Sequence, residues 1–290
     1  MARSIKDEFV NELKNGTLRQ LLEYVRTDDT LNLELRGGEI ILYYRGGALL
    51  TVVQDSYTFI GLSKEYRQSD TFIVPSIENI EEYIPKAKHV IDVYVNTVKN
   101  HLGEKDIQQQ IARENNYSVN SLDTDYFIID TEYQNFGRFD IVAIRWDSTS
   151  SSRKLTAISP LPTLTIFEVK QGYKSIAGSS GMVSHINDFN RFICSDGVDD
   201  FKTDMLNVFK QKCRLGLIRG IDKYRYEDIN TVAKEIEFVF LLANYKSNSA
   251  QINKALKDIK ECKFIYANAM GYGLYARNII DEKQFTKMFL

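Results

Sequence analysis

The chain has 290 residues, enough for one large domain or two smaller ones, and 43% of its residues are hydrophobic. With 26% charged residues, this composition is typical of a folded globular protein and excludes a long disordered chain. The net charge of -2 provides no overall positive field, so nucleic-acid binding would need a local basic groove. No apolar run is long enough to span a membrane and the charged N-terminus is unlike a signal peptide, so we expect a cytoplasmic protein.

Sulfur and imidazole ligands are too scattered to indicate a metal site. Cys194, Cys213 and Cys262 are odd in number and lack close spacing, which indicates ordinary thiols in a reducing compartment. The three histidines show no zinc-ligand spacing either: His89, His101 and His185. This argues against a zinc enzyme.

Residues 1–85 predict a small domain of helices followed by a β-meander. Apolar residues at nearly helical spacing between residues 4 and 26, interrupted at Asn15-Gly16, indicate two short amphipathic helices. Alternating runs separated by pairs of turn residues then predict strands at 31–36, 39–44, 48–54 and 57–62. The aromatic pair Tyr43-Tyr44 has two interpretations: packing within the sheet, which we favour, or contact with bases or a protein partner.

The segment from Ile77 to Asn116 has a helical pattern, with predicted breaks at Pro85 and around Gly103. We place a domain boundary at the first of these breaks, so that residues 86–290 form a second, larger domain. A helix beginning after Gly103 carries two acids, Glu104 and Glu114.

Two strands of this larger domain carry charges inside apolar runs. Residues 137–144 include Asp140, and residues 163–170 end in Glu168-Val169-Lys170; both runs are rich in β-branched and aromatic residues. Because side chains alternate along a strand, Glu168 and Lys170 share one face. If Asp140 lies on a neighbouring strand, two carboxylates and one ammonium converge. Buried unpaired charges are costly, so these groups should meet one another, a metal ion or water.

The preceding strand, residues 126–134, carries a further acid, Glu132, whose position relative to Asp140 depends on the length of the turn between the strands. A three-residue turn at 135–137 would pair Gln134 with Arg138 and set Glu132 opposite Asp140 on the same face. A two-residue turn would move Glu132 one step out of this register. Like charges directly opposite each other are unfavourable unless a cation lies between them, which makes the first register informative.

The C-terminal half supplies the remaining layers of the domain. Helical patterns span 182–193 and 198–217, and the first of these helices should cross the sheet near the charged strands. Candidate contacts to phosphate or bases there are Lys174, His185, Asn187 and Arg191. A strand at 237–243, a helix at 250–260 and a strand at 263–267 then predict a parallel pair added to the sheet.

Asp140, the gap after it and Glu168-Val169-Lys170 resemble the core of the PD-(D/E)XK nuclease superfamily. Phe139 stands where the family name has proline, and residues 148–154 look like the loop that lengthens the gap. The resemblance covers about residues 86–290. It implies an α/β (α+β) fold with a restriction-endonuclease-like mixed central sheet flanked by helices, here preceded by the small helical and β-meander domain.

The same resemblance implies a metal-dependent nuclease acting on nucleic acid, with DNA as the first candidate. Asp140 and Glu168 would bind Mg²⁺ or Mn²⁺, and Lys170 would position the attacking water or stabilise developing charge. In the family, a helix before the hairpin often contributes a further glutamate; Glu104 matches that position, and Glu114 is the second candidate. The alternative for either acid is a solvated helix residue, the commoner fate of helical glutamates, and for Glu104 the two interpretations have equal weight.

Two other interpretations stay open. The charges could form a cross-strand ion pair on a half-exposed strand, with no chemical role. Alternatively, the fold could be a catalytically inactive module that binds nucleic acid, or a protein partner through the N-terminal domain. A second copy of the chain, in a homodimer, is a further candidate partner.

Overall fold

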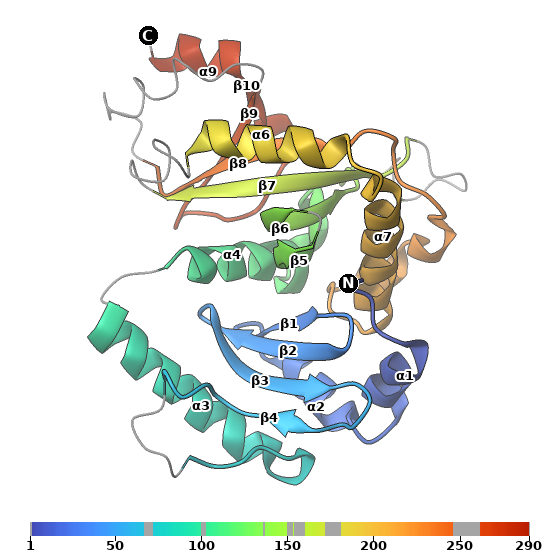
Figure 1. The fold of residues 1–290 in the computed structure, drawn as a ribbon, viewed down its shortest axis with the longest axis vertical. Helices are drawn as coiled ribbons and strands as arrows, with labels where there is room; N and C mark the ends of the chain where they lie inside the picture. The colour runs from blue at the N-terminus through green and yellow to red at the C-terminus, as the bar shows by residue number, and fades with distance from the viewer. Residues whose placement is uncertain are drawn as a thin grey trace.

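The computed structural model describes residues 2–66, 72–99, 103–135, 137–149, 153, 160–171, 181–245 and 262–289. In this part of the chain the strands form a four-stranded and a six-stranded sheet, with helices packed against both (Figure 1). The protein is therefore of mixed α and β class, as the sequence predicts.

The N-terminal region has the predicted two helices and β-meander. Its elements are α1 (Asp7–Asn15), α2 (Arg19–Thr27), β1 (Asn32–Leu35), β2 (Glu39–Tyr44), β3 (Gly47–Val53) and β4 (Phe59–Ile60). The four strands are antiparallel in the order β1-β2-β3-β4. Arg45 and Gly46 both have positive φ and join β2 to β3 in two residues, the conformation that suits a twisted hairpin.

The predicted break at Pro85 is wrong. A short 3-10 turn (Ile77–Asn79) leads into α3 (Ile80–Tyr94), which continues through this proline. Pro85 lies on the exposed side of the helix, where water can satisfy the carbonyl that the missing N–H leaves unbonded. The opposite side of α3 is buried, and this packing outweighs the local preference of one proline.

The six-stranded sheet confirms the five predicted strands, the antiparallel hairpin and the parallel C-terminal pair, and adds a short sixth strand, β10 (Ile280–Asp281). Its members are β5 (Tyr126–Gln134), β6 (Arg138–Arg145), β7 (Thr163–Gln171), β8 (Glu237–Ala243), β9 (Lys263–Ala267) and β10 (Ile280–Asp281). β5, β6 and β7 are antiparallel, β8 and β9 continue from β7 in parallel, and β10 pairs antiparallel with β9. The helix predicted at 250–260 lies outside the described residues.

Helices cover both faces of this mixed sheet (Figure 1). The elements are α4 (Glu104–Ala112), continued by a π turn (Arg113–Tyr117), then α6 (Met182–Ile193), α7 (Val198–Arg214) and α9 (Glu282–Phe289). Ile107 and Ile111 of α4 pack on one face with Phe167, whereas Met182 of α6 packs with Phe240. α4 also contacts β2, so it lies between the two sheets. No described helix combines the length and apolar character needed to cross a membrane.

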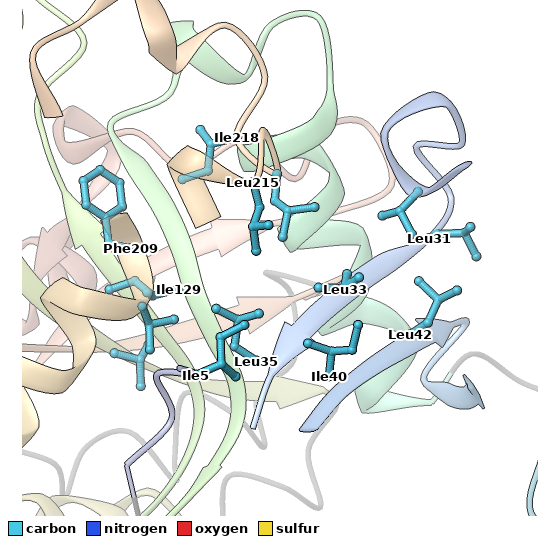
Figure 2. Packing of buried hydrophobic residues seen from close by; sticks show 14 of the residues in the cluster. Ile5, Leu31, Leu33, Leu35, Ile40, Leu42, Ile129, Phe209, Leu215 and Ile218 are labelled. Carbon is cyan, nitrogen blue, oxygen red and sulfur yellow. The ribbon is translucent and has the colours of Figure 1, made fainter. Parts of the chain in front are cut away.

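The predicted boundary at residue 85 falls within α3, and one hydrophobic core extends across it. Figure 2 shows residues of the N-terminal region and of the larger region packed together: Ile5, Leu31, Leu33, Leu35, Ile40 and Leu42 with Ile129, Phe209, Leu215 and Ile218. The N-terminal region is therefore fixed against β5 and α7 by apolar contact.

A buried ionic cluster also joins the two regions. Nζ of Lys212 in α7 lies 3.0 Å from Oε2 of Glu34 in β1, and both side chains are 0% exposed. Arg36 forms an ion pair with Asp130 of β5 and donates to the Thr131 carbonyl at 2.7 Å. Because β5 is an edge strand, this side-chain donor also covers backbone that would otherwise be open to pairing.

Candidate active site

Asp140 and Glu168 meet where β6 and β7 separate. The paired ladder between these strands ends at Ile141 and Phe167. One residue further, Oδ2 of Asp140 accepts a hydrogen bond from the Val169 N–H at 2.7 Å. A side-chain oxygen therefore replaces the ladder carbonyl at this point and holds Asp140 beside the end of β7.

The two charged residues of β7 are buried and paired with each other. Nζ of Lys170 donates to Oε1 of Glu168 at 2.8 Å, and their side chains are 5% and 4% exposed. This excludes the half-exposed cross-strand pair, because the partners lie on one strand and are nearly inaccessible. Nδ1 of His185, from α6, lies 3.0 Å from the same Glu168 oxygen, a distance that requires a proton on that nitrogen. His185 thus orients Glu168, and the phosphate contact expected of it stays a prediction.

Glu104 reaches the same cluster from the first residue of α4. Its carboxyl group lies close enough to Asp140 for the two groups to shift each other's pKa. Of the two acids predicted on this helix, Glu104 is the one near the strand residues. Glu114 lies ten residues later, about 15 Å further along the helix axis.

The electrostatics of the three acids differ. Burial, then the charges of Glu168 and Glu104, raise the pKa of Asp140 well above its ordinary value. Burial also raises the pKa of Glu104, with Glu168 and Glu132 adding to the shift and Lys170 opposing it. Burial acts against ionised Glu168 as well, but the hydrogen bonds and charges of His185 and Lys170 outweigh it and lower the pKa of Glu168. The cluster therefore holds one stable carboxylate and two acids that favour a shared proton or a cation.

The predicted three-residue turn is confirmed, because Gln134 pairs with Arg138. The pairs on either side of Glu132 would place it across from Asp140, yet Glu132 has a left-handed backbone with φ of 56°. Its carboxylate accepts from Nε2 of Gln108 at 2.9 Å and lies 3.5 Å from Nζ of Lys105. Glu132 is thus near the cluster but bound to α4, which relieves the repulsion expected of two facing acids.

Glu132, Asp140, Glu168 and His185 line a cavity of about 320 Å³, here called the active-site pocket, whereas Glu104 and Lys170 lie behind its lining residues. Its lining residues are Glu132, Tyr133, Gln134, Arg138, Phe139, Asp140, Glu168, Ser184, His185 and Asp188. Comparison with protein-family models, curated proteins and solved structures finds no match to this chain. The chemistry of the pocket must therefore be inferred from its own residues.

The donor set suits a hard cation. Mg²⁺ typically binds one or two carboxylates and keeps several waters, and Asp140 with Glu104 offers two crowded carboxyl groups that a cation would relieve. Among the described residues, however, no three His, Cys, Asp or Glu side chains are arranged as a ready metal site. Glu168 explains part of this, because Lys170 and His185 already occupy Oε1. The carboxyl groups of Asp140 and Glu104, with Glu168 beside them, therefore suit a hard cation by their chemistry.

The other predicted substrate contacts are only partly near the site. Arg191 pairs with Asp188 on the exposed side of α6 and lines a neighbouring cavity together with Arg138. Asn187 is exposed and lines neither cavity. Lys174 lies outside the described residues.

The residues near the cluster that the sequence did not indicate include Ser184 and Asp188, which line the active-site pocket, and Gln108, which donates to Glu132 without lining that pocket. Ser184 and Asp188 flank His185 on α6, and one helical turn from His185 is enough to predict Asp188 on the same side. Gln108 is four residues after Glu104 on α4, so helical spacing also places it on the side of the acids. Helical spacing could have indicated both Asp188 and Gln108, but only after His185 on α6 and Glu104 on α4 had been assigned to the site.

Proposed function

We propose that this protein is a metal-dependent nuclease that hydrolyses phosphodiester bonds in nucleic acid, with DNA as the primary substrate. The observation that supports this is the convergence of Glu104, Asp140, Glu168 and Lys170 from α4, β6 and β7. Three acids and one lysine at the opening of two separating strands supply the groups that such a reaction requires.

Asp140 and Glu104 would hold Mg²⁺ or Mn²⁺, with Glu168 available beside them. When bound, the ion would polarise a phosphoryl oxygen and ease deprotonation of water. Lys170 contributes an ammonium that Glu168 holds at 2.8 Å, so it can orient a water or stabilise negative charge on phosphate. His185 supports this arrangement by contacting the same Oε1 of Glu168, 3.0 Å from its Nδ1.

Cleavage of supercoiled and linear DNA with Mg²⁺, and with EDTA as the metal-free comparison, tests the proposal. Asp140→Asn and Lys170→Met should each lower the rate by roughly a hundredfold or more, the usual loss when a group acting on the transition state is removed. Glu114→Gln is the matched control, since it removes one acid from the continuation of the same helix outside the cluster. Cleavage by Asp140→Asn at the wild-type rate would reject the proposed role.

A second candidate function is a binding module that keeps this fold without the chemistry. It is favoured by the engagement of Glu168 with Lys170 and His185 and by the lack of a ready three-ligand group among the described residues. Calorimetry with Mg²⁺ separates the two functions: heat of binding that disappears in Asp140→Asn supports the nuclease, and no heat with DNA binding retained supports the module. Size-exclusion chromatography of the same samples tests the homodimer.

A further inference from the structure

A second cavity adjoins the active-site pocket, between the N-terminal sheet and α4. It has a volume of about 360 Å³ and shares Glu132 and Gln134 with the active-site pocket. We name it the β2–α4 pocket; its main lining comes from β2 with Ile41 and Tyr43, and from α4 with Lys105 and Gln108. Since Glu104 contacts Asp140 while the next residue, Lys105, lines this cavity, the start of α4 forms part of the wall between the two.

The β2 wall presents an aromatic surface. Side chains alternate along the strand, so Ile40 and Leu42 face the core (Figure 2), whereas Ile41 and Tyr43 are half-buried and line the cavity. The guanidinium of Arg36 lies 5.9 Å from the centroid of the Tyr43 ring. An aromatic ring next to a guanidinium is a surface on which any of the nucleobases can stack.

The polar groups of the cavity are held in place by buried contacts. The Arg36 side chain is 7% exposed and is anchored by Asp130 and the Thr131 carbonyl. Gln108 is 1% exposed and donates to Glu132. Nε2 of Gln109 donates to the carbonyl of Tyr43 at 3.1 Å, which ties the β2 backbone to α4. A cavity whose walls are already fixed loses little conformational entropy when a ligand binds.

We propose that the β2–α4 pocket receives one nucleotide of a single nucleic-acid strand whose adjoining phosphodiester lies in the active-site pocket. The inference rests on the proposed function for the place of the phosphodiester, whereas binding of the strand is measured separately from cleavage. A volume of about 360 Å³ is at the lower end of small-ligand sites, which suits one nucleotide. A base inside a duplex would first have to leave its stack, at a cost of a few kcal/mol, whereas a single strand offers it freely.

Fluorescence anisotropy of the full chain in EDTA, where the proposed metal chemistry is switched off, tests this binding. The probes are labelled oligo(dT), oligo(rU) and a blunt DNA duplex, each about ten nucleotides long, within the usual range for single-strand sites. At least one single strand should bind about tenfold or more tightly than the duplex. Tyr43→Ala should weaken single-strand binding by roughly 5- to 150-fold, the equivalent of one lost stacking contact, and Tyr43→Phe should retain most of it.

Tyr57→Ala is the matched control, because this tyrosine is exposed and lines neither pocket. Circular dichroism confirms that each variant is folded. Equal affinity for the duplex and both single strands, or unchanged affinity in folded Tyr43→Ala, would overturn the proposal. These dissociation constants are measured in EDTA and do not depend on cleavage. If Asp140→Asn cleaves DNA as fast as wild type, the nuclease proposal fails while the binding result still stands, so the two proposals can fail separately.

Discussion

Replacing Lys212 by methionine should strongly destabilise the protein, because it removes one partner of a fully buried ion pair. Nζ of Lys212 lies 3.0 Å from Oε2 of Glu34, with both side chains 0% exposed. After the change, the partners of Glu34 within the described part of the chain are the Asn32 amide at 2.9 Å and the Arg36 guanidinium at 3.8 Å, which Asp130 also engages. Methionine preserves the length of the side chain, so the main loss is the charge.

Breaking a buried pair from one side costs about 3–5 kcal/mol, since the remaining charge has no water to replace its partner. That loss is a large part of the usual unfolding free energy, about 5–15 kcal/mol. It corresponds to a fall of between roughly a hundredfold and a few thousandfold in the folding equilibrium constant. Because Lys212 and Glu34 come from regions that share one core, the N-terminal region and the six-stranded sheet should lose stability together.

Urea unfolding followed by circular dichroism and by the fluorescence of buried Trp146 measures this loss. Lys210→Met is the matched control: it lies two residues away on α7, and its ammonium donates to a carbonyl at an exposed position, so its cost should stay below about 1 kcal/mol. Adding Glu34→Leu to Lys212→Met should recover much of the loss, because it removes the unpaired charge. A Lys212→Met variant that loses less than about 1 kcal/mol, which is no more than a surface ion pair contributes, would refute the reasoning.

Three further predictions concern residues on or next to β5 and β6: Asp140, Asp125 and Asn116. Without metal, Asp140→Asn should be more stable than wild type by about 1 kcal/mol and should melt at a higher temperature, because it removes one of three crowded acids. Added Mg²⁺ should raise the melting temperature of wild type and leave that of Asp140→Asn unchanged. The Asp125 carboxylate accepts two backbone N–H bonds, which outweigh the effect of burial and lower its pKa. Ionised Asp125 therefore stabilises the folded protein fully above about pH 3.9, the ordinary pKa of an unfolded aspartate, and this stabilisation is lost as the pH falls through the lower pKa of the folded state. Urea melts should therefore show Asp125→Asn weaker by about 1.5 kcal/mol at neutral pH, with the difference from wild type closing in acid; a constant difference would contradict this. Asn116 both donates to and accepts from the Ile128 backbone on the edge strand, so Asn116→Ala should cost about 2–4 kcal/mol and promote aggregation detectable by light scattering.

Short-range sequence patterns predict most of the strands of the larger region. Runs rich in β-branched and aromatic residues located β6 and β7, and the three-residue turn, one of two that the sequence allowed, gives the hairpin register that the structure has. A strand is selected by residues two apart and a hairpin by the length of its turn, so both signals lie within a short segment. The charges of Glu168 and Lys170 were conspicuous for the same reason, since they interrupt an apolar strand.

The arrangement of the site depended on contacts between distant segments. No local pattern states that His185 of α6 holds Glu168, or that the backbone of Glu132 turns left-handed so that its carboxylate meets Gln108. Likewise, Lys212 and Glu34 are 178 residues apart, and each looks like an ordinary surface residue until the sheets pack. Periodicity specifies which face of an element is buried, whereas the partner that covers that face is chosen by the packing of the whole chain.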